Sequence, residues 1–98
     1  MIFVDTSAWY AIEVEDDINH ETAREFLTKL ASGKHGVLIT NDYVLEETMT
    51  LLRSKKGLFT ALTFIDKIKK SKSIRIFWAR ENIFDKALGF FKKKSDLP

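Results

Sequence analysis

The chain has 98 residues, of which 45% are hydrophobic and 31% are charged, and this balance is typical of one globular domain rather than of a disordered chain. Cysteine is absent, which excludes disulfides and thiolate metal sites, so that any metal ion would bind through oxygen or imidazole. No segment approaches the ~20 apolar residues of a membrane span, and we expect a cytoplasmic protein.

The net charge of +2 conceals an uneven distribution along the chain. Residues 1–52 contain 3 basic and 10 acidic side chains, whereas residues 53–98 contain 13 basic and 4 acidic ones. Clustered lysines bind polyanions by releasing condensed counterions, which favours a nucleic-acid partner. A solvated helix surface explains the pattern equally well. The densest groups are Lys67, Lys69, Lys70 and Lys72, and then Lys92 to Lys94.

The first half of the chain predicts a strand and two helices. Residues 2–4 form an apolar run that ends at Asp5, as in a strand buried on both faces of a parallel sheet. Residues 7–14 predict a helix capped by Thr6 or Ser7. Asn19 is a suitable cap for the next helix, which ends near Gly33 to Gly36. Its apolar positions are His20, Ala23, Phe26, Leu27, Leu30 and Ala31.

The second half predicts two further strands among helices. Residues 37–40 repeat the buried-strand pattern, and residues 40–42 then supply caps for a helix that ends before Gly57. Residues 58–68 predict another helix. Residues 73–78 alternate as a strand does, with Ile74, Ile76 and Trp78 on one side. The last predicted helix has Ile83, Phe84, Ala87, Leu88 and Phe91 on its inner face.

Strands separated by helices predict an α/β fold, in which right-handed crossovers build a parallel sheet with helices on both faces. Residues 1–98 then form a single domain. At this length only about two thirds of the unfolded surface can be buried, which favours oligomerisation. Ligands of such sheets bind outside the carboxyl ends of the strands, where Asp5 lies.

Two acidic residues are candidates for a site at that edge. An unpaired buried carboxylate is costly, so Asp5 must either remain hydrated, cap the next helix or bind a cation. From the sequence, capping and metal binding are equally good explanations for Asp5. Glu46 and Glu47 are neighbours on the predicted helix after residue 42, and their directions differ by about 100°. Glu47 aligns with Val44 and Leu51 on the apolar stripe, whereas Glu46 lies on the polar face.

Convergence of Asp5 and Glu47 would favour a hard cation, Mg²⁺ or Mn²⁺. Such ions promote phosphodiester cleavage, because they activate water and stabilise the charge that develops on the phosphate. Asp5 and Glu47 are therefore the candidate catalytic and metal-binding residues.

Other reactive or aromatic side chains have structural explanations. A core or capping role suits His20 better than catalysis does. Trp9, Trp78 and the phenylalanines could stack on bases, but their spacing favours core positions. Ser7 has no Gly-x-Ser-x-Gly surroundings, and no glycine-rich phosphate loop is present.

The chain resembles the PIN-domain ribonucleases of the VapC toxin type. The similar segments, in chain order, are Asp5-Thr6-Ser7-Ala8-Trp9; Asp17, His20, Ala23, Phe26 and Leu27; Thr40-Asn41-Asp42-Tyr43-Val44-Leu45-Glu46-Glu47-Thr48-Met49-Thr50-Leu51-Leu52-Arg53; and Ala61, Phe64, Ile65, Ala87 and Phe91. Asp-Thr-Ser alone would be weak, but this ordered series is difficult to obtain by accident.

The resemblance implies a Rossmann-like PIN fold and a Mg²⁺- or Mn²⁺-dependent endoribonuclease, often a dimeric toxin with an antitoxin partner. By position, Asp5 and Glu47 are its first and second metal-binding acids, with Thr6 or Ser7 nearby. The family continues beyond the last residue of this chain with a segment resembling Ser-Phe-Thr-Asp, which contributes a third acid, and with a further strand and helix. Whether Asp96 replaces that acid stays open.

We therefore expect a truncated PIN domain that lacks the C-terminal strand and helix and has weak or no activity. Uncovered apolar surface would favour a homodimer or a bound partner. The alternative is a catalytically silent PIN remnant that acts as a protein- or RNA-binding module.

Overall fold

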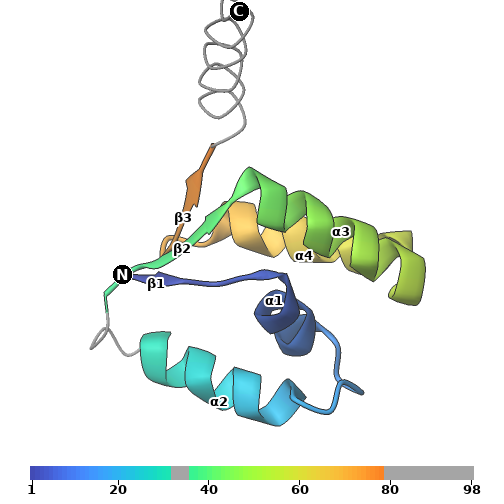
Figure 1. The fold of residues 1–98 in the computed structure, drawn as a ribbon, viewed down its shortest axis with the longest axis horizontal. Helices are drawn as coiled ribbons and strands as arrows, with labels where there is room; N and C mark the ends of the chain where they lie inside the picture. Colours follow the sequence, from blue (N-terminus) through green and yellow to red (C-terminus); the bar gives the residue numbers. More distant parts are fainter. Residues whose placement is uncertain (32–35, 79–98) are drawn as a thin grey trace, which may run out of the picture.

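The computed structural model describes residues 1–31 and 36–78, which form three strands and four helices (Figure 1). In chain order these are β1 (Ile2–Phe3), α1 (Thr6–Glu13), α2 (His20–Ala31), β2 (Leu38–Asn41), α3 (Asp42–Lys56), α4 (Leu58–Lys70) and β3 (Ile74–Phe77). Every element predicted within these ranges is confirmed, with small shifts at its ends. The last predicted helix, Lys92 to Lys94 and Asp96 lie outside the described residues.

The three strands form one parallel sheet in the order β1-β2-β3, and each connection between neighbouring strands contains two helices. Ile2 pairs with Leu38, and Leu38 pairs in turn with Ile74. A backbone hydrogen bond of 2.8 Å from the Val4 amide to the Ile39 carbonyl extends the first pairing by one residue. The carboxyl ends of all three strands therefore lie at one edge of the sheet. Asp5 and the start of α3 are located at this edge.

The hydrophobic core lies against one face of this sheet. Val4, Leu38 and Thr40 are buried on that face, and Ile74 and Ile76 pack against the same core. On the opposite face, Phe3 is 54% exposed and Phe77 is 56% exposed. Helices on both faces were expected, but within the described residues the helices share the core of one face. A short apolar run such as residues 2–4 does not distinguish one buried face from two.

A buried hydroxyl connects three elements at the centre of the core. Trp9 Nε1 donates to Thr40 Oγ1 at 3.2 Å, and Thr40 Oγ1 donates to the Val4 carbonyl at 3.3 Å. Thr40 is fully buried, and the Trp9 ring meets Phe64 edge-on with 5.9 Å between ring centroids. These contacts fix α1 against β1, β2 and α4.

The helix pair α3 and α4 begins and ends as the sequence predicts. Asn41 is the last residue of β2, and its side chain caps α3 by accepting a hydrogen bond from the Val44 amide at 2.9 Å. Gly57 separates the helices with φ +100°, a conformation that side chains rarely adopt. A Cβ at this position would meet nothing within 4 Å, so that the requirement for glycine is conformational rather than steric.

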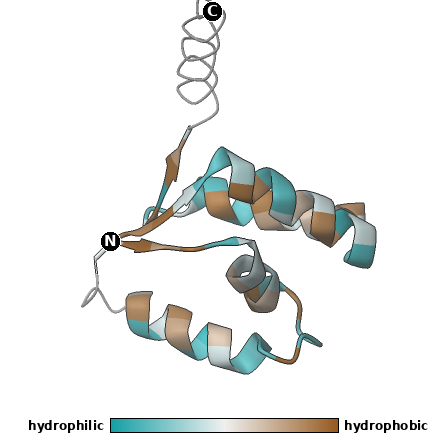
Figure 2. Cartoon of the chain, in the orientation of Figure 1, coloured by the Kyte–Doolittle hydropathy of each residue, from teal (hydrophilic) through white to brown (hydrophobic). Residues whose placement is uncertain are grey.

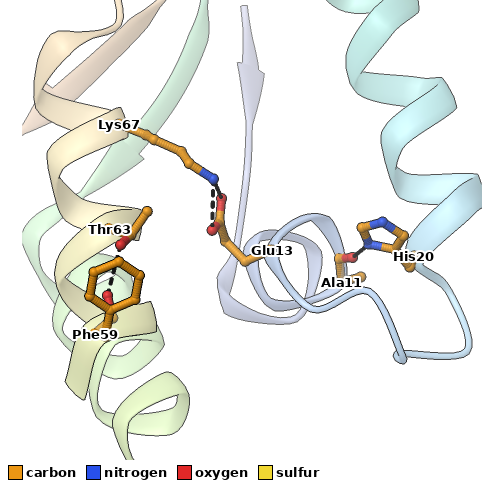
Figure 3. Close-up of polar contacts among 6 residues, drawn as sticks. All are labelled: Ala11, Glu13, His20, Phe59, Thr63 and Lys67. Atoms are coloured by element: carbon orange, nitrogen blue, oxygen red, sulfur yellow. Dashed lines mark hydrogen bonds and ion pairs between the residues drawn. The ribbon is translucent and has the colours of Figure 1, made fainter. Parts of the chain in front are cut away.

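Side-chain contacts attach α1 to α2 and α4 (Figure 3). His20 Nδ1 lies 2.7 Å from the Ala11 carbonyl oxygen, which agrees with the structural role predicted for this half-buried histidine. Lys67 Nζ donates to both carboxylate oxygens of Glu13, at 3.2 and 3.3 Å. Thr63 Oγ1 donates within α4 to the Phe59 carbonyl.

Several aromatic residues predicted for the core lie on the surface instead. Trp9 and Phe64 are buried, but Trp78 is 65% exposed and Phe59 is 83% exposed. The strands are mainly apolar, whereas the helices alternate between apolar and polar residues (Figure 2). None of the helices in residues 1–31 and 36–78 combines the length and apolar character that a membrane crossing requires.

Thr40→Val is predicted to destabilise the fold by about 1–3 kcal/mol, because the buried Trp9 indole N–H loses its acceptor while the side-chain shape is kept. Urea unfolding followed by circular dichroism measures the change. Thr63→Val is the matched control and should cost less than about 0.5 kcal/mol, since its hydroxyl only returns to its own helix. Equal losses in the two variants would contradict the role given to Thr40.

Candidate acidic site at the carboxyl edge of the sheet

Asp5 is exposed and caps α1 from the end of the first strand segment. Its Oδ1 accepts from Ser7 Oγ at 3.0 Å and from the Ala8 amide at 3.2 Å. Thr6 and Ser7 were predicted as caps; the cap is Asp5, because helix α1 begins one residue earlier than expected. Oδ2 accepts no hydrogen bond from the described residues. One oxygen thus caps the helix while the other stays accessible to a ligand.

Glu47 lies in the second turn of α3 and is exposed. Within the described residues it has neither a hydrogen bond nor an ion pair. The buried residues of α3 are Asp42, Leu45, Thr48 and Leu52. Glu47 therefore lies outside the buried stripe, on the side of the half-buried Val44 and Leu51, rather than on the stripe itself as predicted.

A contact between α1 and α3 relates the two carboxylates to each other. Thr6, the neighbour of Asp5, donates through Oγ1 to the Val44 carbonyl at 3.5 Å, and Glu47 lies three residues after Val44. A groove of about 700 Å³ beside this contact is lined by Thr6, Tyr43, Glu46, Glu47, Thr50, Leu51 and Ser54. Asp5 adjoins this groove through Thr6 but does not line it.

Glu46 was predicted to lie on the polar face of its helix. It is exposed, but it lines the groove together with Glu47. The groove runs along the outer surface of α3 and is wide enough to include the side chains of both Glu46 and Glu47. Helical spacing predicted that the two side chains point in different directions. It could not predict that both would line the same groove.

The carboxylate oxygens fit part of the coordination shell of a hard cation, which prefers oxygen ligands and retains water. Asp5 Oδ2 and the Glu47 carboxylate are the candidate ligands at this edge of the sheet. Among residues 1–31 and 36–78, no group of three or more acidic, histidine or cysteine side chains is arranged to bind a metal. A cation bound here would therefore depend on water, substrate or further ligands to complete its shell.

Other acidic residues near α1 have structural partners. Lys56 Nζ donates to Asp16 Oδ2 at 2.8 Å, and this hydrogen bond lowers the pKa of Asp16 and raises the pKa of Lys56. Asp17 Oδ2 accepts from the Asn19 amide at 2.9 Å. These contacts fix the segment between α1 and α2, and they lie apart from the residues that line the groove.

The fold is that of a small parallel α/β domain, with Asp5 after the first strand and Glu47 in the second turn of the helix that follows β2. The family model of the PIN domain matches residues 2–98, and the chain belongs to the PIN-domain family.

Two curated relatives and one solved structure extend this assignment. The chain is 28% identical over 91 residues to a VapC ribonuclease of Archaeoglobus fulgidus, a match that covers 93% of this chain. It is 44% identical over 57 residues, 58% of this chain, to the 23S rRNA-specific endonuclease VapC20 of Mycobacterium tuberculosis. These matches span 57% and 40% of the relatives' own lengths.

The crystal structure of Mycobacterium tuberculosis VapC20, described as a Sarcin-Ricin loop cleaving toxin, superposes on this chain with a TM-score of 0.70 at 28% identity. The superposition covers all of this chain and 72% of that one. The predicted α/β PIN fold and the resemblance to VapC ribonucleases are therefore confirmed.

Asp5→Ala is predicted to destabilise the protein by about 1 kcal/mol through loss of the α1 cap, whereas Asp5→Asn should leave stability nearly unchanged because asparagine caps equally well. Urea unfolding of both variants measures the difference. A loss of stability in Asp5→Asn as large as that in Asp5→Ala would show that the negative charge, and not the cap, stabilises this end of α1.

Proposed function

We propose that the chain is a Mg²⁺- or Mn²⁺-dependent endoribonuclease of the PIN type that acts as the toxin of a toxin–antitoxin pair. The observation on which this depends is the pair of available carboxylates at the sheet edge. Asp5 Oδ2 and Glu47 have no partner among the described residues, and the Thr6–Val44 contact joins the elements that contain them. Carboxylates without a structural partner are available for a ligand.

In this proposal Asp5 and Glu47 are both the metal ligands and the catalytic acids. A divalent cation held by Asp5 and Glu47 would activate water and stabilise the charge that develops on the attacked phosphate. The hydrogen bonds from Ser7 and the Ala8 amide fix one Asp5 oxygen and so orient the other. Thr6 maintains the spacing between this cap and α3 through the Val44 carbonyl.

The relatives support RNA as the substrate. The Archaeoglobus fulgidus relative is named a ribonuclease, and VapC20 is named a 23S rRNA-specific endonuclease. The basic residues of this chain agree with a polyanionic substrate. Within the described residues, the side chains of Arg53, Lys55, Lys69, Lys72 and Arg75 form no ion pair and are exposed. Such cations are available to phosphates.

An antitoxin protein and a second copy of the chain are the proposed protein partners. The support is exposed apolar surface, because Phe3 and Phe77 lie on the open face of the sheet and are each more than half exposed. Phe59, Leu58 and Leu62 add a second exposed apolar group where α4 begins.

The alternative function is a catalytically silent binding module. It is favoured by the finding that the described residues contain no group of three potential metal ligands. Titration calorimetry with Mn²⁺ distinguishes the two functions, because a silent module would release no heat above that of Asp5→Asn.

Asp5→Asn and Glu47→Gln are each predicted to reduce Mn²⁺-dependent cleavage of single-stranded RNA at least ~100-fold, because either change removes a charged ligand from a site that has few. Cleavage of an end-labelled oligoribonucleotide, with and without Mn²⁺, measures this effect. Asp5→Asn keeps the helix cap, so its loss of activity would not arise from unfolding.

Glu25→Gln is the matched control for Glu47→Gln, since Glu25 is an exposed acid on α2. It should leave cleavage unchanged. Wild-type activity that survives EDTA, or an equal loss in Glu25→Gln, would contradict the metal-dependent mechanism.

A further inference from the structure

A second depression adjoins the candidate site, between α3 and α4 at the carboxyl end of β3. It has a volume of about 310 Å³ and is lined by Asp42, Leu45, Glu46, Met49, Ile65, Lys69 and Trp78. A volume of about 300–1,000 Å³ is usual for pockets that bind small molecules or parts of larger ligands. Neither the cap at Asp5 nor the groove beside Thr6 uses this depression.

Trp78 gives the depression its character. It follows the last residue of β3 and is 65% exposed, although the strand pattern predicted that it would share the inner side with Ile74 and Ile76. Trp9, in contrast, is 2% exposed, and its indole N–H is bonded to Thr40. An indole left on the surface beside apolar Met49 and Ile65 offers a stacking face for a flat ring.

The lining of the depression also contains a basic side chain. Lys69 lies on the same lining from α4 and is exposed, so it can meet a phosphate at the rim. Lys69 forms no ion pair within the described residues.

The depression and the groove that contains Glu47 lie next to each other on α3, because Glu46 lines both. A single-stranded RNA that crosses α3 would therefore pass from one to the other. We infer that the Trp78 depression binds one nucleobase of the RNA substrate, by stacking on the indole, while Lys69 binds the phosphate of the same or an adjacent nucleotide. This inference rests on the proposed function, and it makes Trp78 and Lys69 positioning residues for the substrate.

Tryptophan fluorescence of the full chain tests the stacking directly. The protein is titrated in EDTA with a mixed-sequence single-stranded 12-nucleotide RNA whose binding is followed independently by the anisotropy of an attached dye. Stacking should quench Trp78, with no contribution from buried Trp9. The quench should disappear in Trp78→Phe, which keeps an aromatic ring and should bind within a few-fold of wild type. An unquenched wild-type signal at saturating RNA would overturn the inference.

Trp78→Ala should weaken RNA binding about 5- to 100-fold, the usual loss when one stacked base is released. Phe59→Ala is the matched control, since Phe59 is an exposed aromatic residue of α4 outside this depression, and it should change the Kd less than twofold. Equal Kd values for Trp78→Ala and wild type would refute the stacking. If circular dichroism shows that Trp78→Ala does not fold, the fluorescence quench of the wild type and its absence in Trp78→Phe test the stacking instead.

Lys69→Ala should reduce the slope of log Kobs against log salt concentration by about 0.7, as expected for one phosphate contact on a single strand. Lys29→Ala, on α2 and outside the lining of the depression, should leave the slope unchanged. An unchanged slope in Lys69→Ala would overturn its assignment.

The two levels of proposal fail in different ways. Cleavage that depends on Mn²⁺ and on Asp5 but is equally efficient in Trp78→Ala would refute the inference and leave the proposed function intact. No RNA binding and no cleavage by the wild type would refute both.

Discussion

The buried hydroxyl of Thr40 is the constraint on which the positions of the other elements depend. It accepts from the Trp9 indole and donates to the Val4 carbonyl, so one side chain of β2 fixes both α1 and the end of the first strand segment. Asp5 directly follows Val4, and Asn41 and α3 directly follow Thr40. The same contact that closes the core therefore brings the start of α1 and the start of α3 to one edge of the sheet.

This arrangement gives Asp5 two roles that do not conflict. A carboxylate has two oxygens, and the cap at Ser7 and Ala8 uses only one of them. The sequence presented capping and metal binding as alternatives for Asp5, but the geometry is compatible with both at once. Glu47 differs, because nothing among the described residues engages it. Its position depends on α3 alone, which the Asn41 cap and the Thr6–Val44 contact locate.

The surface shows that the described part of the chain is organised around one covered face of the sheet. Phe3 and Phe77 on the other face, and Phe59 at the start of α4, remain exposed. Exposed apolar groups of this kind are candidate contact surfaces. Trp78 differs from them, because it lines a depression next to the candidate site together with apolar Met49 and Ile65 and basic Lys69. That combination suits a polar aromatic ligand better than a flat protein interface.

The sequence by itself determined the order and type of the elements within the described residues, the parallel α/β class, and the strand-end position of Asp5. Local physics governs these features: the period of apolar residues, the cap at Asn41, and the break at Gly57. Only the tertiary structure decided which side chains are buried. Trp78 lies outside although its spacing matches Ile74 and Ile76, and Glu46 meets the same groove as Glu47 although it points elsewhere on the helix. The spacing of residues along the chain specifies the direction in which each side chain leaves its helix or strand. Burial depends on what packs against that side of the element, and these contacts come from distant segments of the chain.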